Sequence, residues 1–343
     1  MKLNLNMSKR IKTAAGAGLA ALAIVVAGGG YYYFHVHNDT PDYAIKTIRN
    51  AIDEHNLKEF HRAVNVDGVL DSGYEGFVDG FTSAENVTTP DAKEAIKNFT
   101  QMLREPLIAS LKSAIDSYVA TGALDTEKNV GVLEMLERTG LNDVELRGVK
   151  NIQLNDANRD EAFADMIIFQ PELGGEFPIQ IVLKRDDDRW QVVRVQNFRD
   201  YVAQIAQARR FQLEEYLKQA SEINMRHGAI IRDAEQKYGM ILSMGSLGDN
   251  KTRAELKNLI AETFQKDWEI RKQELFSLRV PKDAQTLHNL YMRICDLWVS
   301  AAQDYAKWLD DKNAATIKSA EDKIHRAQTL TTEAAAIAKR MTG

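Results

Sequence analysis

The spacing of hydrophobic and polar positions divides the chain into four successive stretches. An apolar run without charges comes first, from Ala14 to Phe34. Helical spacing follows from Pro41, strict alternation begins at Val144, and helical spacing returns from Tyr201 onward. Apolar residues every three to four positions predict amphipathic helices, whereas a period of two predicts half-buried strands. The pattern therefore predicts an apolar helix, an α+β domain and an all-α region, in that order.

The apolar run has the length of a transmembrane helix. Its 21 residues match what a helix needs to cross a hydrocarbon core of about 30 Å. The basic residues that precede the run are Lys2, Lys9, Arg10 and Lys12. The aromatic residues at its end are Tyr31, Tyr32, Tyr33 and Phe34, and the acidic residues after it are Asp39 and Asp42. This distribution places the N-terminus inside the cell and the rings at the membrane interface. We predict a cytoplasmic tail over 1–12 and a single transmembrane anchor over 13–36 in a bacterial cytoplasmic membrane, with the bulk of the chain extracytoplasmic.

A cleaved signal peptide is the alternative interpretation of the same run. Residues 14–27 have the length of the apolar core of a signal sequence, and Val25 and Ala27 could precede a cut after Ala27. Apolar residues continue past the glycines at 28–30, which favours retention as an anchor. Both interpretations export the rest of the chain.

The α+β domain predicted over 39–200 begins with helices. Asp39, Thr40 and Pro41 form a helix start, with Asp39 or Thr40 as the cap and Pro41 near the first helical position. This helix runs to about His55, and a turn is expected at Asp67–Gly68. The further expected helical segments are 57–64, 69–81 with breaks at Gly73, Gly76 and Gly80, and 91–121 with one apolar stripe from Ile96 to Val119.

Four strands complete this domain in the prediction. Residues follow a strand-like pattern in 144–154, 161–169, 176–184 and 190–197. The residues at 174–175 and 186–189 are typical of turns between the later strands. Consecutive strands joined by short turns form an antiparallel meander. We therefore expect helices followed by a four-stranded antiparallel sheet, not a βαβ arrangement.

Two stretches of this domain resemble known families. The sequence D-T-P-D-Y-A-I-K-T-I-R-N-A-I-D-E-H-N-L-K-E-F, with Val64–Asp67 and Val69–Asp71 after it, resembles the bacterial membrane-anchored family called domain of unknown function 2939. The strand R-W-Q-V-V-R-V-Q-N-F is similar to the last strand of nuclear transport factor 2-like folds, in which helices pack against a curved sheet. The resemblance implies a cone-like α+β domain just outside a membrane anchor. Neither family supplies catalytic residues to carry over.

The region 201–343 shows no strand pattern and is rich in helix-forming residues. Turn residues divide it into four predicted helices, 201–244, 251–278, 282–310 and 314–341. Short connections imply an antiparallel helical bundle. The third helix shows its packing face most clearly, with apolar residues alternately four and three positions apart: Leu287, Tyr291, Ile294, Trp298, Ala301, Tyr305 and Trp308.

Composition and charge exclude several classes of function. Hydrophobic residues make up 44% and charged residues 27% of the chain, which is ordinary for folded proteins, and the net charge of −5 offers no basic field for nucleic acid. Cys295 is the single cysteine, so intramolecular disulfides and cysteine-based metal sites are excluded. None of the seven histidines shows the spacing of a metal pair, and the sequence has no Walker loop or G-x-S-x-G elbow. We predict no catalytic residues, no cofactor and no metal ligands.

The strand that contains Asp165 offers a candidate binding site. Alternation places Phe163, Asp165, Ile167 and Phe169 on one face of that strand. Because cone-like folds often keep a cavity, we expect these residues to line an apolar ligand cavity. In the bundle, an apolar helix face contains His227 one turn after Asn224, and we expect the two in a polar layer of the core; Cys295 is expected to be a buried, inert thiol.

These features support three hypotheses about function. The first is a membrane-tethered, extracytoplasmic interaction or scaffold protein of the bacterial envelope, without catalytic activity, whose partners are the membrane and an envelope protein. The alternative is an extracytoplasmic carrier or sensor that binds a lipid or another apolar small molecule in the α+β cone. An envelope enzyme that uses Asp165 has the least support. The sequence does not define an oligomeric state.

Overall fold

The computed structural model describes residues 40–84, 90–123, 130–142, 144–187 and 189–342. The predicted anchor and cytoplasmic tail lie outside the described residues. Within those ranges, no helix combines the length and the apolar character that crossing a bilayer requires. The chain divides into two compact units, with the division between Ala208 and Arg209. The sequence pattern predicted this division between 200 and 201.

The first unit begins with helices. They are α2 (Pro41–Asp53), α3 (Leu57–Ala63), α4 (Val66–Ala84), α5 (Pro90–Thr121) and α6 (Val130–Arg138). Thr40, one of the two predicted caps, caps α2, because its hydroxyl oxygen accepts a hydrogen bond from the Tyr43 amide at 3.3 Å. Large apolar side chains from these helices, among them Phe60, Leu111 and Ile115, are fully buried in the core of this unit.

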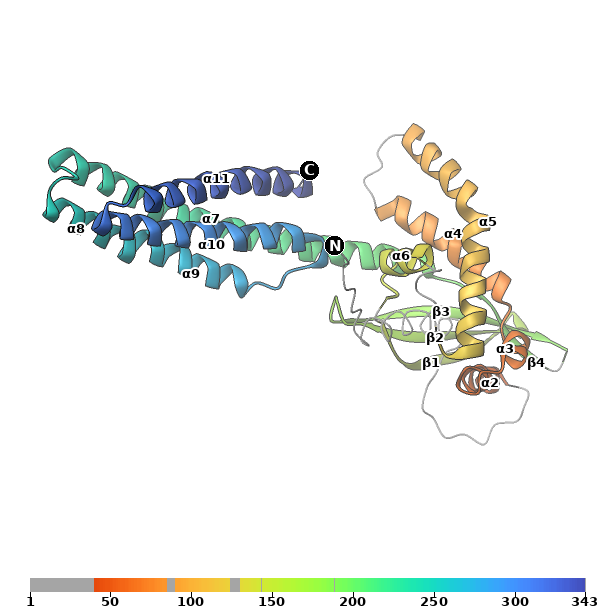
Figure 1. Ribbon diagram of the computed structural model, residues 1–343. Helices are drawn as coiled ribbons and strands as arrows, with labels where there is room; N and C mark the ends of the chain where they lie inside the picture. Colours follow the sequence, from red (N-terminus) through yellow and green to blue (C-terminus); the bar gives the residue numbers. More distant parts are fainter. Residues whose placement is uncertain (1–39, 85–89, 124–129, 143, 188, 343) are drawn as a thin grey trace. The chain divides into compact units, whose positions relative to one another are not determined.

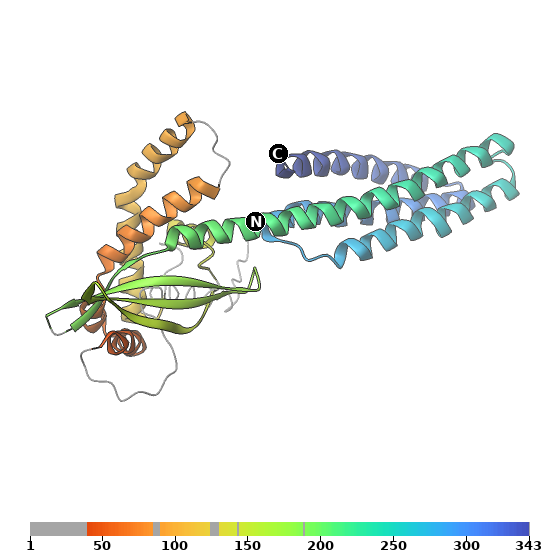
Figure 2. The ribbon, with the colours of Figure 1, turned by 180° about the vertical axis from the view of Figure 1, so that it is seen from behind.

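Four antiparallel strands follow in the order of the chain. They are β1 (Glu145–Asn155), β2 (Asn158–Gln170), β3 (Gly175–Asp186) and β4 (Arg189–Val195). The predicted α+β class and four-stranded antiparallel sheet are therefore confirmed. In β2, Ala162, Ala164, Met166 and Ile168 are buried against the helices, and the alternate residues lie on the opposite face. We call these the inner and outer faces of the sheet; α5 crosses the inner face (Figures 1 and 2).

Helix α4 is one continuous helix, so the predicted breaks at its glycines and the turn at Asp67–Gly68 are wrong. The glycines instead permit close approach. A methyl group added at Gly68 would lie 2.6 Å from the carbonyl oxygen of Val193, and one at Gly80 would lie 2.8 Å from that of Arg199. Because these positions lack side chains, α4 can lie directly against β4 and against the beginning of the helix that follows β4 in the chain.

Helix α7 (Phe198–Met244) contributes to the cores of both units. Near its beginning, Tyr201 and Ile205 are buried in the first core. Further along, Tyr216 and Ala220 are buried in the second. The beginning of α7 therefore belongs with the sheet, although its hydrophobic spacing continues without a break into the helical region.

The second unit is helical in its described residues, which confirms the predicted helical C-terminal region. After α7 it contains α8 (Asn250–Leu259), the π-helical segment η1 (Ile260–Gln265), α9 (Lys266–Phe276), the short 3₁₀ helix η2 (Lys282–Ala284), α10 (Gln285–Asp311) and α11 (Ala314–Thr342). The backbone stays helical from α8 through η1 into α9. Figure 2 shows the long helices side by side, and Leu287, Ile294 and Ala301 are buried on the predicted face of α10.

Candidate functional site

The residues predicted to line a cavity lie on the outer face of β2. Phe163, Asp165, Ile167 and Phe169 are half-buried there, while the inner face is packed with apolar side chains of the helices. Phe163 and Asp165 line a recess in the surface, and Ile167 and Phe169 are not part of its lining. The ring of Phe169 instead lies 4.5 Å from the guanidinium carbon of Arg147. The structure thus brings together only two of the four predicted residues.

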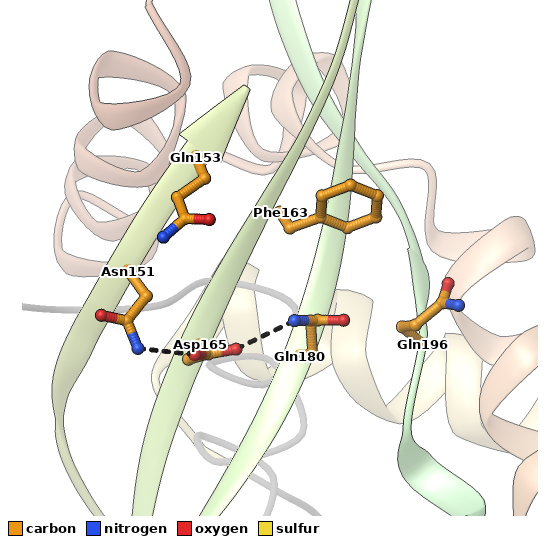
Figure 3. A pocket seen from close by; sticks show the side chains of 6 residues that line it. All are labelled: Asn151, Gln153, Phe163, Asp165, Gln180 and Gln196. Carbon is orange, nitrogen blue, oxygen red and sulfur yellow. Dashed lines mark hydrogen bonds between the residues drawn. The ribbon is translucent and has the colours of Figure 1, made fainter. Parts of the chain in front are cut away.

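The recess crosses the sheet from β1 to the end of β4. Its volume is about 350 Å³, and it opens to solvent. Small-molecule sites commonly measure about 300–1,000 Å³, so this recess is at the lower end of that range. Its lining residues are Asn151, Gln153, Phe163, Asp165, Gln180 and Gln196 (Figure 3).

Asp165 is held between carboxamides from the two neighbouring strands. Asn151 Nδ2 donates a hydrogen bond to Oδ2 at 2.8 Å, and Gln180 Nε2 donates one to Oδ1 at 3.1 Å (Figure 3). Gln180 is directly opposite Asp165 in the ladder of β2 and β3, so their side chains share a face. Each carboxylate oxygen can accept more than one hydrogen bond, so both retain acceptor capacity.

An irregularity in β1 brings Asn151 to Asp165. The pairing of β1 with β2 shifts between Lys150 and Gln153, and Asn151 has a φ of 54°. Asparagine tolerates this left-handed conformation better than most residues. Bulges of this kind change the direction of a side chain at the edge of a sheet. The local backbone therefore positions one of the two donors that fix the carboxylate.

Asp165 is the only charged residue among those that line the recess. Four of the others are carboxamides, each of which has both donor and acceptor atoms, and the last is a phenyl ring. The Gln196 side-chain oxygen accepts a hydrogen bond from Arg194 Nε at 3.2 Å, and Arg194 also pairs with Glu161 at 3.4 Å. The recess thus combines one fixed negative charge with neutral groups that can donate and accept.

Apart from the Asp165 carboxylate, the residues that line the recess offer no nucleophile and no group that could transfer a proton. Amide groups orient the Asp165 carboxylate, but they do not titrate as a general base or acid would. No group of three or more histidine, cysteine or acidic residues suited to a metal ion occurs in the described part of the chain. The chemistry of the recess suits binding.

The carboxamides of the recess were not predicted from the sequence. Asn151, Gln153, Gln180 and Gln196 belong to other segments than Asp165, and strand register determines which of them meet it. One signal was present, since Gln180 interrupts an apolar run between Ile179 and Ile181. A polar residue in such a run indicates the face that is not packed in the core.

A second polar cluster, formed by His227, Asp267, Arg271 and Glu274, lies inside the helical unit. The first three residues are 3%, 5% and 6% exposed. His227 Nδ1 lies 2.7 Å from Asp267 Oδ1, and its Nε2 lies 3.1 Å from Glu274 Oε2. Arg271 donates to Asp267 at 3.3 Å, and its guanidinium carbon is 3.7 Å from the centre of the Trp268 ring. His227 is thus in a polar layer as expected, but its partners are acidic residues of α9.

This cluster joins α7 to α9. Both ring nitrogens of His227 face carboxylate oxygens, so both must carry hydrogen for both hydrogen bonds to form. Except for Arg271 Nε, which is buried without a hydrogen-bond partner, the charged groups are occupied by one another, and His227 and Asp267 are almost wholly removed from solvent. The cluster therefore has a structural role, because little of its bonding capacity is available to a ligand.

Cys295 is buried, as the sequence predicted, with 1% of its surface exposed. Removal from solvent raises the pKa of its thiol to about 12, and the nearby Arg271 opposes this rise only in part. The thiolate is the reactive form of cysteine, so this side chain reacts very slowly at neutral pH.

No protein-family model, curated protein or solved structure matches the chain. What the structure defines is an α+β unit with a four-stranded antiparallel sheet, followed by a helical unit.

Proposed function

We propose that the chain is a non-catalytic binding protein of the bacterial envelope, tethered to the cytoplasmic membrane, with both folded units on the extracytoplasmic side. The placement is supported by the apolar run over 14–34 and the charges that flank it. The resemblance to a membrane-anchored bacterial family favours the same placement. Tethering keeps the binding unit close to the membrane, where its partners in the envelope are found.

The recess on the outer face of the sheet is the observation that carries the binding function. Asp165 is fixed by two hydrogen bonds before any ligand arrives, and it keeps acceptor capacity toward solvent. A group that is already oriented loses little conformational freedom on binding. The polar lining favours a polar ligand, whereas a lipid or other apolar molecule would remove water from the remaining acceptor positions of Asp165 without replacing those hydrogen bonds.

Cysteine labelling tests both parts of this proposal. The single native cysteine is buried and has a raised pKa, so a cysteine introduced at the surface can be labelled above a low background. Gln196→Cys places a thiol in the recess, and Glu176→Cys is the matched control, exposed on the outer face but outside the recess. The unsubstituted chain measures the background from Cys295.

We expect a membrane-impermeant maleimide to label Glu176→Cys in intact spheroplasts. Labelling only after lysis would contradict the extracytoplasmic placement. We also expect Gln196→Cys to react more slowly in native membranes than in the purified chain, because a bound ligand covers it, while Glu176→Cys reacts at the same rate in both. Equal rates for Gln196→Cys in the two preparations would contradict the binding function.

A further inference from the structure

We infer that the recess on the outer face binds a neutral saccharide, an inference that rests on the proposed binding function. It follows from three properties of the lining: its charge, its hydrogen-bonding groups and its one aromatic ring. Each property excludes or favours a different class of ligand.

The charge of the recess disfavours anions. Asp165 contributes a negative charge, and none of the lining residues is basic. A phosphate, a carboxylate or an anionic lipid headgroup would therefore meet a like charge, and the neighbouring Arg194 is already paired with Glu161 and bonded to Gln196. Recognition of such groups depends on arginine, lysine or oriented backbone amides.

The hydrogen-bonding groups match hydroxyls. Each sugar hydroxyl donates one hydrogen bond and accepts others, and each carboxamide of the recess can do both. The two oxygens of Asp165 are held side by side by Asn151 and Gln180, so they can accept hydrogen bonds from two adjacent hydroxyls. Hydrogen bonds to an ionised group are stronger than those between neutral groups, so Asp165 is the principal anchor.

Phe163 supplies the apolar part of the surface. Its ring lies above Gln180 in Figure 3, on the side of the recess toward Gln196. Sugars carry C–H groups on the faces of their rings, and these groups pack favourably against an aromatic side chain. Because the recess opens to solvent, it fits part of an extended glycan chain better than a small molecule enclosed on all sides.

Titration calorimetry on the purified full chain tests this inference. The detergent must have no sugar headgroup, because alkyl glycosides would compete for the recess. The probes are four neutral trisaccharides: chitotriose, cellotriose, maltotriose and mannotriose. We expect at least one to bind, with its affinity reduced tenfold or more by Asp165→Asn and also reduced by Phe163→Leu. Glu176→Gln removes a charge from the same face outside the recess and should change affinity less than twofold.

The outcomes separate this inference from the function on which it rests. If none of the trisaccharides binds, or if Asp165→Asn and Phe163→Leu leave binding unchanged, the saccharide inference is wrong. A lysine-rich peptide that binds in an Asp165-dependent way, while the sugars do not, would overturn the inference but keep the binding function. Urea unfolding midpoints equal to that of the unsubstituted chain show that both variants are folded.

Discussion

Asp165 and His227 are each held by side chains of neighbouring elements, but they differ in what they offer to solvent. Each carboxylate oxygen of Asp165 accepts one hydrogen bond from a side-chain amide, and the residue is only half-buried. His227 has both ring nitrogens occupied and is 3% exposed. The first arrangement leaves capacity for a ligand, whereas the second satisfies the groups within the protein. The same type of polar contact thus leaves acceptor positions open in one unit and is satisfied within the protein in the other.

Loss of His227 should destabilise the helical unit. In His227→Leu the buried Asp267 loses its closest partner and keeps only Arg271, and leaving a buried acceptor without a hydrogen bond typically costs about 1–3 kcal/mol. Arg226→Ala is the control, since its side chain is 59% exposed and pairs with the same Glu274; its cost should be below about 1 kcal/mol. Urea unfolding followed by tryptophan fluorescence measures both, because Trp268, Trp298 and Trp308 belong to this unit. Equal effects of the two substitutions would contradict the structural role of the cluster.

At the scale of elements, hydrophobic spacing predicts a helix better than it predicts the partner of that helix. The apolar stripe predicted for α5 runs from Ile96 to Val119. Leu111 and Ile115 are buried in the core, but Phe99 is 60% exposed and Met102 is 75% exposed. The spacing is the same in both halves, and burial depends on whether another element packs there. A stripe in the sequence therefore does not show how far a core extends.

Helix α4 shows the same difference between pattern and packing. Its glycines suggested breaks, because glycine lowers the stability of an isolated helix. In the fold, Gly68 and Gly80 lie where neighbouring backbone leaves no room for a side chain, whereas nothing lies within 4 Å of a methyl group at Gly73. Tertiary contacts stabilise the helix despite the low propensity of these residues.

The glycines of α4 should respond to alanine in opposite directions. Gly68→Ala would place a methyl group 2.6 Å from the Val193 carbonyl oxygen, and such overpacking typically costs about 1–3 kcal/mol. Gly73→Ala has free space and should stabilise the helix by up to about 1 kcal/mol. Circular dichroism during urea unfolding of the full chain gives both changes. If Gly68→Ala instead raised the stability, α4 could not lie as close to β4 at Gly68 as the structure shows.

For the whole molecule, the sequence predicts the α+β and helical architecture of the described residues, but of the residues that line the recess it predicts only Phe163 and Asp165. The change from helical spacing to alternation at Val144 predicted the sheet, and turn residues predicted the helical region after it. The recess depends on strand register and on the positive φ of Asn151, which place side chains distant in sequence next to Asp165. A hydrophobic pattern specifies which face of a strand is buried, but it does not specify which residue of the next strand lies opposite.

The most direct test of the binding function is the rate at which Gln196→Cys is labelled in native membranes, with and without Asp165→Asn. If a ligand bound through Asp165 covers the recess, labelling should be slow in the single variant and several times faster when Asp165→Asn is added. The rate for Glu176→Cys, outside the recess, should be the same in both backgrounds. Equal rates for Gln196→Cys with and without Asp165→Asn would contradict the proposal that the outer face of the sheet is an occupied binding site.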